Sequence, residues 1–305
     1  MNTYADVDAS LNRIKSLTYF GLLLNFFLMI SKFVGGIIFG SFGLIADAFH
    51  TLSDIATDLV LLWGVIVGSK PPDSSHPFGH GKFETLSGMV LSAILIGVGI
   101  GIATEAGKSL MINSYLTPGI PVILIAAVSV ISKEFIFQKT IKTAVELDST
   151  ALHANAWHHR SDAMSSIVVI FGAVSSMFGF LPGDNIAGLF VGFMIFVVGI
   201  KFMYETGKEL METSVTKEIR ISIQSIIDGH PKVKGWHQLR TRKVGRELFI
   251  DVHLLVNQDL SVSEGHLIAE EVEKIVRQTL KRPANIITHV EPDIPFERRK
   301  SDSDG

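Results

Sequence analysis

Six long apolar segments constrain this sequence more than any other feature. A helix needs about 20 mostly apolar residues to cross a bilayer. Only 19% of the 305 residues are charged and the mean hydropathy is +0.38, whereas soluble proteins carry about 25% charged residues. We therefore predict an integral membrane protein rather than a soluble globule or a disordered chain. The six predicted spans are at about 17–39, 42–67, 86–106, 120–141, 155–181 and 186–210.

The basic residues of the short connections predict the orientation of these spans. Lysine and arginine are enriched in cytoplasmic loops. Arg13 and Lys15 precede span one, and Lys70 and Lys82 lie between spans two and three. Lys139 and Lys142 follow span four. The opposite loops carry little beyond Lys108. We expect a multi-pass protein of the cell membrane, inner or plasma, with both termini in the cytoplasm.

The composition changes at about Glu212, where short apolar runs begin to alternate with charged residues. Helical spacing and period-two alternation predict a helix at 216–229, strands at 235–242 and 247–256, a helix at 263–280 and a strand at 285–290. This α-β-β-α-β order is typical of a small α+β, ferredoxin-like domain. We expect a six-helix transmembrane domain at 1–212, a cytoplasmic domain at 213–292 and a flexible tail at 293–305.

Composition also limits the chemistry that is available to the chain. It contains no cysteine, which excludes disulfides, thiolate metal sites and cysteine nucleophiles. Any metal ion must be held by histidine, aspartate, glutamate or backbone oxygen, and eleven histidines are present. The net charge of -3 argues against a large nucleic-acid-binding surface, so no nucleic acid partner is expected.

Two predicted spans contain ionisable residues at helical spacing. Span two carries His50 and Asp54, and span five carries His158 and Asp162. Residues four apart lie on the same face of a helix, and charged groups at bilayer depth usually serve a function. Two such pairs facing each other offer two nitrogens and two oxygens, a four-coordinate set suited to zinc.

Each of these features has a structural alternative. A single histidine–aspartate pair could be a hydrogen bond between spans, although two copies are harder to explain in this way. Asp47 and Asp58 lie near the same stripe as the pair in span two and could line an access path, relay protons or accept helix-end hydrogen bonds. Lys32 is close enough to the end of its span to extend toward the membrane surface, and we expect both Lys32 and Glu105 to be interfacial or paired with a neighbour.

The motifs together resemble the cation diffusion facilitator family, particularly its bacterial zinc exporters. Both H-x-x-x-D pairs, the loop Asp73-Ser-Ser-His76-Pro-Phe-Gly-His80-Gly-Lys82 and the trailing small domain occur in the order typical of that family. The resemblance extends from span one to about Pro292. It implies a homodimer in the lipid bilayer that exchanges a divalent cation for protons by alternating access.

The resemblance also implies two metal sites outside the spans. One is a cytoplasm-facing site at Asp73, His76 and His80, although these histidines could merely stabilise the loop. The other is a binuclear site near the dimer interface, formed by His237, His253, His266, His289 and Glu291. Glu291 stands where related sequences often have aspartate, and Asp251 is a possible extra ligand or a partner of one.

We therefore expect a secondary active transporter that exports Zn²⁺ from the cytoplasm, with no organic cofactor. Fe²⁺, Mn²⁺, Co²⁺, Ni²⁺ and Cd²⁺ remain alternative cargoes, and a membrane metal sensor without flux is the alternative from another class. A metalloprotease is disfavoured because the chain lacks an H-E-x-x-H motif. We also expect an ion pair between Lys82 and Glu212 at the cytoplasmic boundary.

Overall fold

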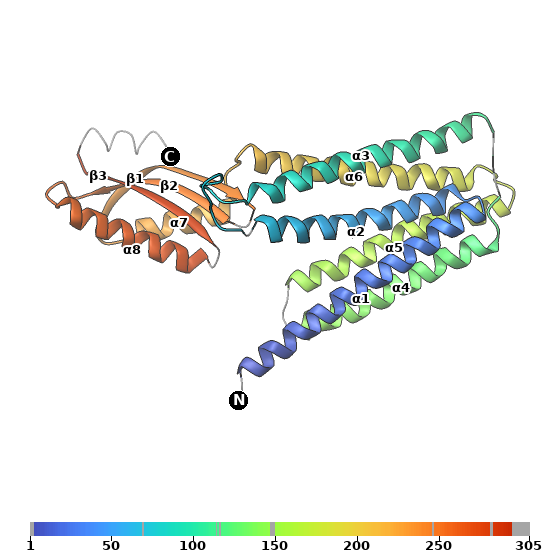
Figure 1. Ribbon diagram of the computed structural model, residues 1–305, viewed down its shortest axis with the longest axis horizontal. Coiled ribbons are helices and arrows are strands. Elements are labelled where there is room, and N and C mark those ends of the chain that lie inside the picture. Colours follow the sequence, from blue (N-terminus) through green and yellow to red (C-terminus); the bar gives the residue numbers. More distant parts are fainter. Residues whose placement is uncertain are drawn as a thin grey trace. The chain divides into compact units, whose positions relative to one another are not determined.

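The computed structural model describes residues 3–68, 70–113, 115, 117–146, 150–245, 247–280 and 283–294 (Figure 1). The chain divides into two compact units, Met1–Val60 with Val90–Phe202 and Leu61–Met89 with Met203–Gly305. Residues 295–305 of the predicted flexible tail lie outside the described residues.

Six long helices account for the predicted apolar segments. They are α1 (Thr3–Ile38), α2 (Phe42–Gly68), α3 (Lys82–Met111), α4 (Ile120–Glu146), α5 (Thr150–Met177) and α6 (Gly183–Leu210). Among the described residues, four stretches are long and apolar enough to cross a membrane: Tyr19–Ile38 of α1, and the whole of α3, α4 and α6. The remaining two helices, α2 and α5, carry the paired histidine–aspartate motifs.

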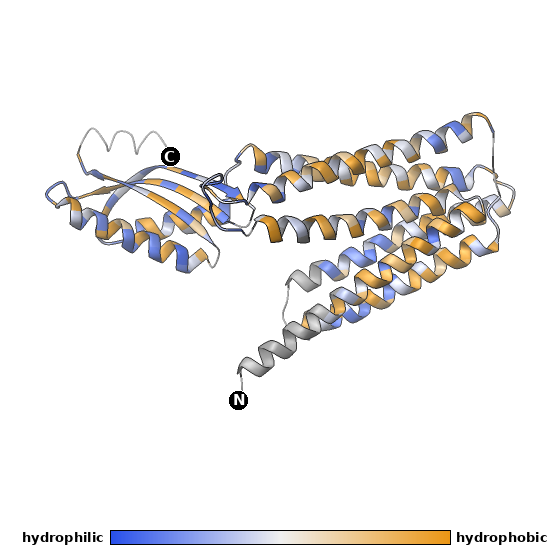
Figure 2. Ribbon diagram, viewed as in Figure 1, coloured by the Kyte–Doolittle hydropathy of each residue, from blue (hydrophilic) through white to orange (hydrophobic). Residues whose placement is uncertain are grey.

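Apolar residues and close helix contacts hold the first unit together. Helix α4 lies beside α5 and also contacts α1. Apolar residues dominate the second half of α5, whereas polar residues are frequent at 155–163 (Figure 2). Helices α3 and α6 meet at Gly99, where an added Cβ would lie 2.8 Å from the carbonyl oxygen of Gly192. Glycine is therefore required for this approach. The core of the unit includes Leu44, Val169 and Ile195.

The second unit contains the predicted α+β domain. Its elements are α7 (Lys217–Asp228), β1 (Val233–Val244), β2 (Glu247–Val256), α8 (Val262–Leu280) and β3 (Ala284–Pro292). The sheet order is β1-β2-β3, with β1 and β2 antiparallel and β2 and β3 parallel. The predicted order is confirmed. Strand β3 is longer than expected, so Glu291 lies within the strand rather than after it.

The two helices of this domain cover one face of its sheet (Figure 1). Ile223 of α7 and Val272 of α8 share a buried cluster with Ile250, Val252 and Leu254 of β2. Because side chains alternate along a strand, the residues between them point to the opposite face. His253 is therefore directed away from the helices.

Candidate metal sites

The first candidate site lies where α2 and α5 meet in the helical unit. One ligand atom from each of His50, Asp54 and Asp162 lies within 4.8 Å of the other two. His50 is 8% exposed and Asp162 5%. Helical spacing stacks His50 above Asp54, and packing brings Asp162 from a helix about one hundred residues away in the sequence. We call these three residues the central cluster.

The fourth predicted ligand of this site lies at its edge. His158 Nδ1 is 3.5 Å from Asp162 Oδ1, and its side chain is 54% exposed. The imidazole is therefore within reach of the central cluster but is more open to its surroundings than His50. One face of α5 thus presents both groups of its motif, as the spacing predicts.

A lysine outside the predicted ligand set completes this arrangement. Lys133 of α4 is 1% exposed, and its Nζ donates a hydrogen bond to Asp162 Oδ2 at 2.9 Å. The same nitrogen is 4.0 Å from Asp54 Oδ2. The signal that could have revealed it was a lone basic residue in the middle of the fourth apolar segment, where charge is costly.

Lys32 is buried and paired with a neighbouring side chain rather than extended to the membrane surface, which is the second of the two expected alternatives. Its Nζ lies 2.9 Å from Asp47 Oδ2 and donates to the hydroxyls of Thr51 and Ser166, both at 3.1 Å. Ser165 and Ser166 each donate to Asp47 at 2.6 Å. A buried lysine needs such partners, and helices α2 and α5 supply them. Asp47 belongs to this network and not to the central cluster.

Two further ionisable residues of the predicted spans are Glu105 and Asp58. Glu105 pairs with Lys108 at 2.7 Å on the same helix, which confirms the expected pairing with a neighbour. The side chain of Asp58 lies outside the described residues.

The second candidate site is the loop between α2 and α3, within the second unit. Asp73, His76 and His80 each place a ligand atom within 4.8 Å of the others, and the two imidazole rings are 4.4 Å apart. The backbone N–H of His76 donates to Asp73 and, with that of Ser75, holds the pKa of the carboxyl below its usual value. The carboxylate is therefore charged and already oriented toward the histidines.

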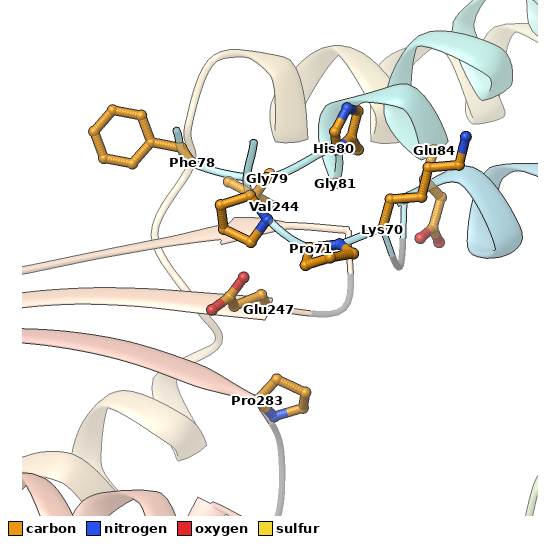
Figure 3. A pocket seen from close by; sticks show the side chains of 12 residues that line it. Lys70, Pro71, Phe78, Gly79, His80, Gly81, Glu84, Val244, Glu247 and Pro283 are labelled. Atoms are coloured by element: carbon orange, nitrogen blue, oxygen red, sulfur yellow. The ribbon is translucent and has the colours of Figure 1, made fainter. Parts of the chain in front are cut away.

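A cavity of about 360 Å³ adjoins this loop (Figure 3). His80 projects from the loop above it, and the turn between β1 and β2 forms another part of its wall (Figure 3). His80 is 10% exposed and lies 3.3 Å from Asp73. Gly245, with φ at +59°, makes that turn, and a Cβ there would lie 3.1 Å from the carbonyl oxygen of Gly81. The turn glycine thus permits the hairpin and the loop to pack closely.

The third candidate site follows from strand register. His237, His253 and His289 occupy directly paired positions on β1, β2 and β3, with neighbouring rings 4.9 and 4.7 Å apart. Glu291, two residues beyond His289, lies on the same face. Its carboxylate is 2.8 Å from both His237 and His253 and 3.3 Å from His289. We call these four residues the sheet cluster.

Hydrogen bonding controls the charge of the carboxylate in the sheet cluster. Burial favours the neutral acid, but the hydrogen bonds from His237 and His253 outweigh it and hold the pKa of Glu291 below its ordinary value. His237 is almost fully buried, whereas His289 is 63% exposed. The cluster therefore offers one carboxylate and three imidazoles, and its solvent exposure increases from His237 to His289.

The expectation that His266 joins this group is not met within the chain. His266 lies on α8, is 70% exposed and pairs with Glu270 at 3.4 Å. The helices cover the opposite face of the sheet, so a side chain on the exposed surface of α8 is directed away from the sheet cluster. Asp251 lies on the same strand face as His253, but its paired residue is Arg240.

The predicted ion pair at the ends of α3 and α6 is confirmed. Lys82 Nζ lies 2.9 Å from Glu212 Oε1, and Arg242 Nη1 lies 2.6 Å from the other carboxylate oxygen. The hydrogen bond from Lys82, together with that from Arg242, holds the pKa of Glu212 below its usual value.

Comparison with known proteins gives consistent matches over nearly the whole chain. Residues 18–211 match the model of the cation efflux transmembrane domain. Residues 215–293 match that of the cation efflux protein cytoplasmic domain.

Among curated relatives, metal tolerance protein C1 of Arabidopsis thaliana is 34% identical, over 89% of this chain and 61% of that protein. Magnetosome protein MamB of Magnetospira sp. is 30% identical, over 86% of this chain and 89% of its own. The manganese efflux system protein MneP of Bacillus subtilis is 29% identical, over 89% of this chain and 93% of the length of MneP. Thus the match spans less than two thirds of the plant protein and most of the bacterial ones.

One solved structure is that of the MamB CTD magnetosome protein of Desulfamplus magnetovallimortis. The match covers 26% of this chain and 96% of the chain in that structure. It is 19% identical, with a TM-score of 0.25.

Proposed function

Because the chain belongs to the cation efflux family of membrane transporters, which are not enzymes, we propose that it exports Zn²⁺ from the cytoplasm in exchange for protons. The coarser statement, efflux of a divalent metal cation, follows from the family. The cytoplasmic domain of that family dimerises, and the chain accordingly acts as a homodimer.

The central cluster is the observation that carries the proposal. Three potential ligands from two helices converge within 4.8 Å, and His158 lies 3.5 Å from one of them. Two imidazoles and two carboxylates form a set that zinc accepts in tetrahedral geometry. The sequence alone could only suggest that the two motifs face each other, and the convergence of the helices supports that suggestion.

The choice of zinc over other metals rests on the imidazoles. Imidazole suits zinc, whereas manganese favours oxygen-rich sites. One relative is named for manganese efflux, so Mn²⁺ belongs in any test of selectivity, together with Fe²⁺, Co²⁺, Ni²⁺ and Cd²⁺.

Proton exchange follows from the chemistry of the same ligands. Metal binding requires deprotonated groups, so affinity falls as pH falls, and histidine ordinarily titrates near pH 6.5. A site that binds Zn²⁺ from the cytoplasm and then opens to a more acidic medium exchanges the ion for protons. Metal and protons thereby use one set of ligands alternately.

The other two clusters have supporting roles in this proposal. The loop residues Asp73, His76 and His80 bind Zn²⁺ on the cytoplasmic side, and the sheet cluster holds Zn²⁺ in the cytoplasmic domain. This arrangement requires six spans in the cell membrane, with both termini in the cytoplasm. The transport domain then comprises residues 1–212 and the cytoplasmic domain 213–292.

Metal flux into proteoliposomes tests the proposal. Vesicles with an imposed pH gradient and an internal zinc indicator should fill with the wild type and fail to fill with His50→Ala or Asp162→Ala. Glu105→Ala, at an exposed ion pair distant in sequence from the motifs, is the matched control and should transport normally.

Undiminished zinc flux in the His50→Ala and Asp162→Ala variants would show that the assigned ligands are wrong. Metal-dependent conformational change without flux in the wild type would instead indicate a sensor. Faster flux of another metal at equal concentration would identify that metal, rather than zinc, as the cargo.

A further inference from the structure

Two lysines are almost completely buried among the helices, and their surroundings differ. Lys32 donates hydrogen bonds to two hydroxyls and pairs with Asp47, whose oxygens are in turn bound by two serines. Lys32, Asp47 and Ser166 each have at least two partners within it. Such a satisfied network is expected to rigidify the core.

Lys133 has a different environment, because its neighbours are the proposed ligands of the transported ion. Its ammonium group bonds Asp162 Oδ2 at 2.9 Å and lies 4.0 Å from Asp54 Oδ2. Among the described residues Asp54 Oδ2 accepts no hydrogen bond, although that atom is buried. The pair of carboxylates is therefore incompletely satisfied by the lysine and retains capacity for a second cation.

A metal ion in the central cluster would lie close to the nitrogen of Lys133. Lys133 Nζ lies within 4.0 Å of one oxygen of each carboxylate, so a metal ion held by His50, Asp54 and Asp162 would lie beside it. Two cations so close together repel each other strongly among buried side chains. The lysine must therefore withdraw when the ion enters, and its flexible four-carbon stem permits this.

We propose that Lys133 competes with the transported cation for the carboxylates of Asp54 and Asp162, an inference that rests on the proposed function. In the metal-free protein its ammonium group neutralises Asp162 and partly neutralises Asp54. Zn²⁺ displaces it from Asp162, and its return helps to expel the ion. Lys133 thereby lowers the affinity of the central cluster, and it keeps two neighbouring carboxylates from facing each other unpaired when the cluster holds no metal.

The alternative role for Lys133 is purely structural, and it predicts the opposite change in affinity. A lysine that only positions Asp162 would, when removed, leave a misplaced ligand and weaker metal binding. A competitor would, when removed, leave stronger binding. The sign of the change in Zn²⁺ affinity thus separates the two roles.

Calorimetric titration of the full-length, detergent-purified protein with Zn²⁺ measures this sign. All variants carry His80→Ala and His253→Ala to weaken the two cytoplasmic clusters, so that the central cluster dominates the signal. We expect Lys133→Met to tighten binding by roughly tenfold to a hundredfold. Lys133→Arg, which keeps the charge and can pair with a carboxylate through two hydrogen bonds, should weaken it.

Lys139→Met is the matched control for this experiment. Lys139 is on the same helix but is exposed, with its amine over the ring of Phe135. Its substitution should leave the affinity unchanged. In proteoliposomes, Lys133→Met should lower both KM and the maximum flux, because the ion enters a stronger site and leaves it slowly.

Unchanged or weaker Zn²⁺ binding by Lys133→Met would overturn the proposal. If that variant does not fold, Lys133→Arg decides, since equal or tighter binding by the arginine contradicts competition. Failure of the proposed function is distinguishable: adding His50→Ala to the same background would then leave the calorimetric signal unaltered.

Discussion

The two units of the chain handle ionisable side chains in different ways. In the helical unit, Lys32 and Lys133 are each 1% exposed and face Asp47 and Asp162. In the second unit, the ion pair between Lys82 and Glu212 has side chains that are 55% and 38% exposed. The buried groups of the sheet cluster are instead imidazoles around one carboxylate.

This difference reflects the cost of removing charge from water. A buried ion pair gains little net stability, but loss of one partner leaves an uncompensated charge. An imidazole can be neutral, so its loss of a partner costs only a hydrogen bond. Exposed ion pairs are solvated with or without their partner. The comparison therefore predicts three sizes of effect.

The largest effect is expected from Asp162→Ala. This change leaves Lys133 buried without its hydrogen-bond acceptor and should lower the free energy of unfolding by about 3–5 kcal/mol. Reversible unfolding in mixed detergent micelles provides the measurement. The double variant Asp162→Ala with Lys133→Met should recover a large part of the loss. Additive losses in the double variant would contradict the ion pair.

An intermediate effect is expected from Glu291→Ala. His237 and His253 would lose their hydrogen-bond partner, at a cost of about 1–2 kcal/mol, and the sheet cluster would bind Zn²⁺ more weakly. Thermal unfolding with and without Zn²⁺ measures both consequences.

Glu270→Ala is the matched control for Glu291→Ala, because its carboxylate is exposed beside His266. It should change stability by less than about 0.5 kcal/mol. Equal effects of the two substitutions would argue against a sheet cluster built around Glu291.

The smallest effect concerns Glu212 and depends on pH. Since Lys82 and Arg242 lower its pKa in the folded protein, its contribution to stability is present above the unfolded value, near 4.3. That contribution is lost as pH falls through the lower folded value. It should amount to less than about 1 kcal/mol because the pair is exposed.

Thermal midpoints of the wild type and Glu212→Gln measured from pH 6 to pH 3 at low salt provide the test. The two curves should converge toward acid. A gap that widens as pH falls would have the wrong sign for this ion pair.

Much of the fold could be predicted because its signals are local. Apolar length predicted the six helices α1–α6, and the periodicity around Ile223 and Ile250 predicted elements of the α+β domain. The bounds were less accurate: β1 begins at Val233 and β3 continues to Pro292. Those ends depend on pairing with β2, which no local pattern contains.

The candidate sites could be predicted in part. Spacing within one helix placed His50 with Asp54 and His158 with Asp162, because helical geometry is regular. Lys133 was missed, and for Lys32 the sequence left a place at the membrane surface and pairing with a neighbour equally open, because the partner of a lone lysine lies on another helix. His266 was grouped with the other histidines on resemblance alone, and the side of the sheet that α8 covers separates it from them.

By itself, the sequence determined that the chain places long apolar helices before a small α+β domain, and that two of these helices carry matching metal ligands. These properties arise from hydropathy and from the repeat of a single helix or strand. Only the tertiary structure decided that a lysine from α4 contacts those ligands, and that strand register aligns His237, His253 and His289. Such contacts join residues far apart in the chain, and their positions are set by packing, which minimises unpaired charge and empty space.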